Sequence, residues 1–189
     1  MTPGMGHNQG PTMEKGQRWR SFQWQKARDA AMPKAIPLMV VKMHVARAHA
    51  LGLDYPTYAM VRKASGRDIM ALLFSSNALR VVKADQPRMP LAQSEVLEAV
   101  SGAKRLALIH APVNAGEVQL ANGCIDAADA APKFTQSWAE MRDHLGGFIA
   151  GQRIARDQVL IIGDTAAERD WMTAAKAAGY IEAGRYFGT

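Results

Sequence analysis

The sequence has little cysteine and no long apolar run. Cys124 is the single cysteine among 189 residues, so this chain cannot close an intramolecular disulfide, which predicts a reducing compartment. No apolar run reaches the roughly 18–20 residues of a membrane span, and residues 1–20 lack the apolar stretch of a signal peptide. We therefore expect a cytoplasmic protein that makes no contact with a membrane.

Several motifs that identify enzyme classes are also absent. The sequence contains no Gly-x-Gly-x-x-Gly, no Walker loop and no Gly-x-Ser-x-Gly. His44 and His49 lie five residues apart, too far round a helix to share a metal ion. The composition, with 48% apolar and 21% charged residues, is that of a folded globular protein rather than a disordered one. Any site must therefore be found from the order of the expected elements.

Positive charge is concentrated in the first third of the chain. Residues 1–67 hold 11 of the 23 Lys and Arg residues but only three of the 17 acids, a net charge of +8, whereas the remainder carries −2. Residues 1–17 are rich in Gly, Pro and polar residues without any period, which predicts a flexible arm. A basic helical region over residues 18–76 follows. The partner of so basic a region is expected to be acidic.

Four short helices are expected in this basic region. They cover residues 17–32, where three aromatic residues stand among basic ones, then 38–53, 54–66 and 67–76. Pro56 lies near the start of the third helix and Gly66 directly after its end. The segments 56–65 and 68–76 together could form a helix-turn-helix, although the apolar "DIMALLFSS" offers little to read bases and has the composition of a core segment.

Nucleic-acid binding would use the same region, because Arg and Lys neutralise phosphates and aromatic rings stack on bases. The candidate nucleic-acid-binding residues are Arg18, Trp19, Arg20, Trp24, Lys26, Arg28, Arg62, Lys63 and Arg67. The alternative is a basic arm that packs on the acidic second half of the chain or on another subunit of a homo-oligomer. In that case the aromatic residues are packing anchors.

From residue 77 to 189 the pattern becomes that of an α/β domain. "SEVLEAVSGA" predicts a helix, residues 105–113 a buried strand, "FTQSWAEMRDHLGGFIAGQRI" a helix, "QVLIIG" a second buried strand and "AAERDWMTAAKAAGY" a helix ending at Gly179. A loop of small residues is expected over 111–132, and "ALRVV" is compatible with a strand or a helical extension. Alternating strands and helices predict a small parallel, Rossmann-like sheet.

Polar residues follow both expected strands. Ile109 is followed by His110, and Ile162 by Gly163 and Asp164. Ligand sites of parallel sheets lie beyond the carboxyl ends of the strands, so His110 and Asp164 are the candidate catalytic residues of one crevice. A simpler explanation covers part of this stretch, because Thr-x-x-Glu from residue 165 to 168 is a helix capping box. Capping leaves Asp164 without a role.

Two resemblances to known families add to this interpretation. "IIGDTAAERDWMTAAKAAGY" resembles the fourth motif of the haloacid dehalogenase superfamily, which implies that Asp164 with Glu168 or Asp170 would hold Mg²⁺ beside a phosphoryl group. The first motif of that family, an Asp-x-Asp after an N-terminal strand, is not found; "DAAD" at 126–129 has a different spacing.

Residues 6–60 resemble the N-terminal block of small alphaproteobacterial and phage proteins that begin Gly-His-Asn-Gly-Gly-Pro, with Gln9 in place of Gly. This resemblance implies a phage or prophage origin and no particular activity. We therefore expect an interaction or regulatory protein that needs no cofactor and whose basic region contacts nucleic acid or an acidic partner. The alternative is a Mg²⁺-dependent phosphohydrolase of the haloacid dehalogenase type, intact or degenerate, centred on Asp164.

Overall fold

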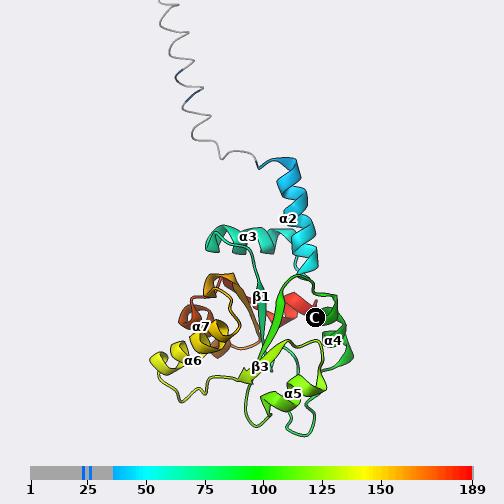
Figure 1. Ribbon diagram of the computed structural model, residues 1–189, viewed down its shortest axis with the longest axis vertical. Coiled ribbons are helices and arrows are strands. Elements are labelled where there is room, and N and C mark those ends of the chain that lie inside the picture. Colours follow the sequence, from blue (N-terminus) through cyan, green and yellow to red (C-terminus); the bar gives the residue numbers. More distant parts are fainter. Residues whose placement is uncertain (1–22, 24–25, 27–35, 189) are drawn as a thin grey trace, which may run out of the picture. The chain divides into compact units, whose positions relative to one another are not determined.

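Residues 71–182 contain a five-stranded, all-parallel sheet (Figure 1). The computed structural model describes Gln23, Lys26 and residues 36–188. The strands, in sheet order, are β3 (Ala127–Ala130), β2 (Lys104–Ile109), β1 (Ala71–Ser75), β4 (Val159–Gly163) and β5 (Gly179–Glu182). The predicted α/β class with a parallel sheet is confirmed.

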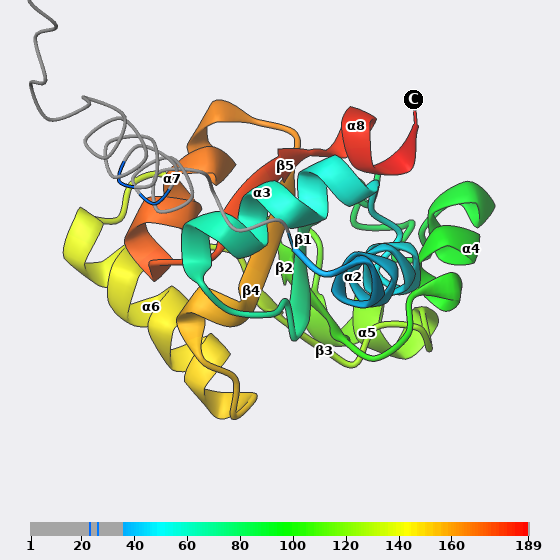
Figure 2. The ribbon, with the colours of Figure 1, turned by 90° about the horizontal axis from the view of Figure 1, so that it is seen from above.

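Helices cover both faces of the sheet. The described helices are α2 (Leu38–Ala50), α3 (Tyr55–Ser65), α4 (Leu91–Ala99), α5 (Ala115–Ala121), α6 (Trp138–Gly151), α7 (Ala166–Ala175) and α8 (Ala183–Phe187), with a 3₁₀ turn at Arg156–Gln158. Figure 2 shows α6 and α7 on one side of the sheet, with α4 and α5 on the other. No helix in this part of the chain is long and apolar enough to cross a membrane.

The core follows from the alternation of side chains along each strand. In β1, Leu72 and Phe74 pack with residues of α3, α4 and α8, while Ala71 and Leu73 pack with α6 and α7. All five residues of this strand are buried. A central parallel strand is covered on both faces, so its sequence is a continuous apolar run rather than an alternating one. Each large apolar side chain buried in this way contributes roughly 1.5–3 kcal/mol.

The predicted helix over residues 67–76 is wrong. The chain leaves α3 at Gly66, which has a φ of 72°, and then enters β1, the central strand of the sheet. A short apolar run is compatible with a buried helix or a buried strand, and only the packing of β2 and β4 on either side decides. The helix-turn-helix is excluded with it. The sheet thus begins before the predicted start of the α/β domain at residue 77.

Three other predicted boundaries are corrected. The expected loop over 111–132 contains α5 and the edge strand β3, whose Ala-Ala-Asp-Ala sequence carries none of the branched or aromatic residues that signal a strand.

The helix predicted to end at Gly179 is shorter. Helix α7 ends at Ala175, before Lys176 in a left-handed conformation, and Gly179 begins β5. "ALRVV" forms neither a strand nor a helix, because residues 77–80 turn. The other expected helices and strands from residue 38 onward are confirmed.

The connections place a switch point at the centre of the sheet. The chain runs from β1 through α4 to β2 and through α5 to β3, and then returns through α6 to β4 on the other side of β1. The direction of winding therefore reverses between β1 and β4. In open parallel sheets, the crevice at such a reversal is where ligands bind.

Candidate functional site at the strand ends

Polar residues stand at the carboxyl ends of three adjacent strands. Strand β1 continues into Ser76 and Asn77, β2 into His110, and β4 into Asp164. The register pairs Ser75 of β1 with Leu108 of β2, so these ends meet at one edge of the sheet. The strands that carry His110 and Asp164 thus end at the same edge of the sheet, with β1 between them.

Glu168 is the centre of this cluster. Its side chain is fully buried, and its Oε1 accepts hydrogen bonds from Asn77 Nδ2 at 2.8 Å and His110 Nε2 at 2.9 Å. Its Oε2 accepts from the backbone N–H groups of Asp164 at 2.6 Å and Thr165 at 3.0 Å. A carboxylate offers about four acceptor positions. All of those on Glu168 are therefore used inside the protein.

These hydrogen bonds keep Glu168 ionised. Burial raises the pKa of the Glu168 carboxyl, but hydrogen bonds from His110 and the backbone of Asp164 outweigh that effect. The side chains of Ser75 and Asn77 lower the pKa further, to about 2. At neutral pH the group is a buried negative charge held by donors from three strand ends.

The pairing with Glu168 determines the tautomer of His110. An ionised carboxylate only accepts hydrogen bonds, so His110 Nε2 must carry a proton. The imidazole also lies against the Trp171 ring, with centroids 5.5 Å apart and planes 31° apart. Its backbone N–H donates to Ser76 Oγ at 3.1 Å. The side chain is 33% exposed, so an acid or base role for His110 would fall to Nδ1.

Asp164 is paired with a residue that the sequence did not indicate. Its Oδ2 lies 2.7 Å from the Arg80 guanidinium. Arg80 has a φ of 60°, a left-handed conformation that is uncommon for a residue with a side chain. No local pattern around "ALRVV" signals this contact, because Arg80 and Asp164 are 84 residues apart in the sequence. Asp164 thus contributes an exposed ion pair at the end of β4.

The predicted capping box is confirmed. Thr165 Oγ1 accepts from the backbone N–H of Glu168, and the Glu168 carboxylate accepts in turn from the backbone N–H of Thr165. Gly163 is needed for this arrangement, because an added Cβ would lie 3.0 Å from Glu168 Cβ and 2.8 Å from a ring carbon of Tyr180. The same carboxylate serves as helix cap and as partner of His110.

The donor set does not fit the magnesium site that the family resemblance implies. The acceptor positions of Glu168 are occupied, Asp164 is paired with Arg80, and Asp170 lies exposed on α7. Strand β1 ends in Ser75 and is followed by Ser76 and Asn77, so the first strand of the sheet has no Asp-x-Asp at its end. Within residues 36–188 no group of three or more His, Cys, Asp or Glu residues could hold a metal ion.

Most of the predicted nucleic-acid-binding residues lie outside the described part of the chain. These are Arg18, Trp19, Arg20, Trp24 and Arg28. Lys26 is described and lies exposed in a helix. Of the other three predicted residues, Arg62 and Lys63 lie in the last turn of α3 and Arg67 follows its C-cap, Gly66. Arg62 contacts the Tyr58 hydroxyl at 3.3 Å, Arg67 pairs with Asp157 at 3.0 Å, and Lys63 is exposed.

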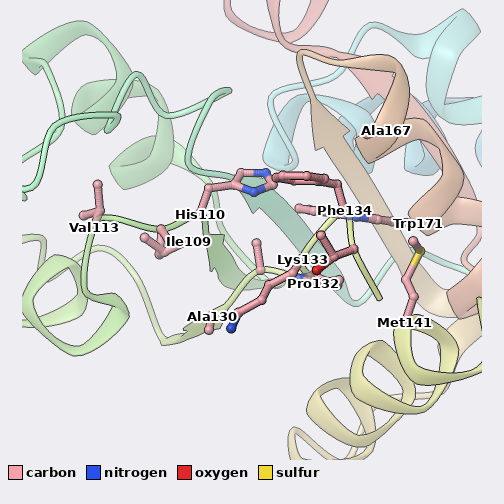
Figure 3. Close-up of a pocket in the computed structure, with 13 residues that line it drawn as sticks. Ile109, His110, Val113, Ala130, Pro132, Lys133, Phe134, Met141, Ala167 and Trp171 are labelled. Carbon is pink, nitrogen blue, oxygen red and sulfur yellow. The ribbon is translucent and has the colours of Figure 1, made fainter. Parts of the chain in front are cut away.

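A cavity of about 420 Å³ opens beside His110 (Figure 3). Its walls come from the ends of β2 and β3, the segment 131–135, α6 and the first two turns of α7. No pattern in the sequence signals this cavity, because Trp171 and Met141 belong to the apolar stripes of two helices and Phe134 to an expected helix start. The structure brings them to one place.

Comparison of the chain with protein-family models, with curated proteins and with solved structures gives no match. The two family resemblances of the sequence therefore stay predictions. What the site can do must be inferred from its own residues.

Proposed function

We propose that the protein is a small interaction or regulatory protein whose basic N-terminal region contacts nucleic acid. The observation that carries the proposal is the net charge of +8 in residues 1–67 against −2 in the remainder. Lys and Arg side chains in such a segment displace counterions from phosphates, and Trp19 and Trp24 supply rings that can stack on bases. An acidic protein surface is the competing partner. The resemblance of residues 6–60 to phage proteins supports a phage or prophage origin.

The strand-end cluster supports a non-enzymatic function. A hydrolase of the type that the sequence resembles needs carboxylates that can hold a cation. Here the Glu168 carboxylate is saturated by its own fold, and Asp164 is neutralised by Arg80. The Glu168 carboxylate holds the ends of β1, β2 and β4 to the start of α7, and the Asp164–Arg80 pair joins the end of β4 to the turn after β1. The cluster is therefore best explained as structural.

The test measures binding of the full chain to a mixed-sequence DNA duplex over a range of salt concentrations. The test variant replaces four basic residues by Gln: Arg18, Arg20, Lys26 and Arg28. The control replaces four exposed basic residues from the second part of the chain: Lys83, Arg88, Arg142 and Lys176. The slope of log K against log salt should shrink by about 0.9 for each phosphate that the test variant no longer neutralises.

The control variant should keep the slope of the unmodified protein. Equal reductions of the slope in both variants would mean that net charge alone is responsible, and would contradict a specific role for the N-terminal region. Binding to an acidic peptide but not to DNA would identify the competing partner. Absence of binding to either would overturn the proposal.

The competing proposal is a Mg²⁺-dependent phosphohydrolase. It rests on the family resemblance and on the grouping of Asp164 and His110 at the ends of β4 and β2 with Glu168 in α7, and it requires a cation to compete with the contacts that these side chains already make. Under this proposal millimolar Mg²⁺ raises the melting temperature through linkage, and Asp164→Asn removes that rise. Asp143→Asn, on an exposed part of α6, should leave the rise intact. An unchanged melting temperature in Mg²⁺ would exclude this form of the enzyme.

A further inference from the structure

We propose that the cavity beside His110 binds a small aromatic anion of one or two rings. The residues that line it come from Ile109 to Trp171, and the proposal does not depend on the function of the basic N-terminal region. Its volume of about 420 Å³ lies in the usual range for small-molecule sites. It also lies at the carboxyl edge of the parallel sheet, where the fold places ligands.

The cavity is held open by fixed elements of the fold. His144 Nε2 lies 2.8 Å from the carbonyl oxygen of Ala130, which ties α6 to the end of β3. Lys133 and Gln136 are joined by two hydrogen bonds, from the Lys133 N–H to Gln136 Oε1 at 2.9 Å and from the Gln136 N–H to the Lys133 carbonyl at 3.0 Å. These bonds fix the segment that forms the mouth. Small residues such as Ala167 line the opposite wall and leave the space unfilled.

Aromatic side chains favour a planar ligand. The His110 ring, already stacked on the almost fully buried Trp171, presents an accessible surface toward the cavity. Phe134 lies at the mouth and is 94% exposed, although it is large and apolar. Figure 3 shows these residues around one space, with Met141 from α6 beside them. A flat ring between His110 and Phe134 would bury apolar surface on both of its faces.

The charges of the lining favour an anion. Among the described residues that line the cavity there are His110 and Lys133 but no Asp or Glu. The buried Glu168 carboxylate, which contacts His110 Nε2, does not line the cavity and is saturated by hydrogen bonds. Within residues 36–188, Lys133 forms no salt bridge. An aromatic ring in the cavity can thus direct a carboxylate or similar group at the Lys133 ammonium.

The experiment uses isothermal titration calorimetry of the full chain with three probes. 2-Naphthoate carries both the rings and the charge, 2-naphthamide keeps the rings without the charge, and octanoate keeps the charge without the rings. We expect 2-naphthoate to bind at least about tenfold tighter than either of the other probes, a difference of about 1.4 kcal/mol. Lys133→Gln should abolish the difference between the acid and the amide.

Two matched pairs of variants locate the site. Ala167→Leu fills the cavity, whereas Ala166→Leu adds the same side chain to an exposed, non-lining position of the same helical turn. Phe134→Ser removes the exposed ring, and Leu120→Ser, at a similarly exposed position away from the cavity, is its control. Ala167→Leu and Phe134→Ser should each weaken 2-naphthoate binding by about tenfold or more, and the two controls should not.

Each outcome decides the proposal. No heat with 2-naphthoate at millimolar concentration would overturn it, as would equal binding of the acid and the amide or of 2-naphthoate and octanoate. Undiminished binding to Ala167→Leu would place the ligand elsewhere and also overturn it. These results are independent of the salt-dependent DNA measurement, so the failure of one proposal is distinguishable from the failure of the other.

Discussion

His110 Nε2 and Glu168 Oε1 lie 2.9 Å apart, in a contact that joins the end of β2 to the first turn of α7. Because Asn77 binds the same oxygen and two backbone N–H groups bind the other, one buried carboxylate connects three strand ends with a helix. The stability of this strand-end cluster therefore depends on the Glu168 carboxylate. Because protonation of this carboxylate would remove hydrogen bonds that it accepts, the stability of the cluster also depends on pH.

The first prediction concerns pH. The pKa of the Glu168 carboxyl is about 2 in the folded protein, against 4.5 for the unperturbed group. The stabilisation is therefore complete above about pH 4.5 and is lost as the pH falls toward 2, a contribution of about 3 kcal/mol to the free energy of unfolding. His110 and Asp164 also face this carboxylate. The measurement is urea-induced unfolding from pH 7 to pH 3.

Glu168→Gln should remove this part of the pH dependence. At pH 7 the variant should be less stable by about 3 kcal/mol, because an amide NH₂ cannot accept the hydrogen bonds that the carboxylate accepted. Asp170→Asn, at an exposed position of the same helix, is the control and should retain the slope of the unmodified protein. Parallel stability curves for the two variants would contradict the assignment of the acid sensitivity to Glu168.

A second prediction tests the pair directly. His110→Ala leaves Glu168 Oε1 with Asn77 as its side-chain partner and should cost about 1–3 kcal/mol in the free energy of unfolding. In a double-mutant cycle with Glu168→Gln, the two effects should be non-additive by at least about 0.5 kcal/mol. Chemical denaturation of the four proteins at pH 7 measures this coupling. Additive effects would show that the 2.9 Å contact between His110 and Glu168 contributes nothing to stability.

Local patterns predict the parts of the site that depend on neighbouring residues. The Thr165–Glu168 capping box is visible in the sequence because helix caps have a fixed spacing of three residues. Because parallel strands end at the same edge of a sheet, the sequence also predicts that His110 and Asp164 lie at one edge. It cannot give their partners, since His110 and Glu168 are 58 residues apart, and Asn77 and Glu168 are 91 apart. Contacts at such separations depend on strand order.

The central strand is the main error of fold prediction, and its cause is physical. The first four residues of "ALLFS" are all apolar and buried, because helices cover both sides of β1. A run of this kind has no period of two, so it resembles a buried helical segment. Without β1 the role of Asn77 is also hidden, because this residue reaches Glu168 only from the end of that strand.

The last prediction concerns the close approach at the end of β4. An added Cβ at Gly163 would lie 2.8 Å from Tyr180 Cε2 and 3.0 Å from both Cβ and Oε2 of Glu168. Gly163→Ala should therefore force the Glu168 carboxylate away from its donors and lower the free energy of unfolding by about 1–3 kcal/mol.

Gly147→Ala is the control. That glycine lies within α6 with nothing within 4 Å of the added Cβ, so the substitution should raise the free energy of unfolding by roughly 0.5–1 kcal/mol. Thermal unfolding monitored by circular dichroism should move the two midpoints in opposite directions. An unchanged midpoint for Gly163→Ala would mean that the end of β4 shifts to accommodate the methyl group, and that the hydrogen bonds of Glu168 do not depend on a glycine at position 163.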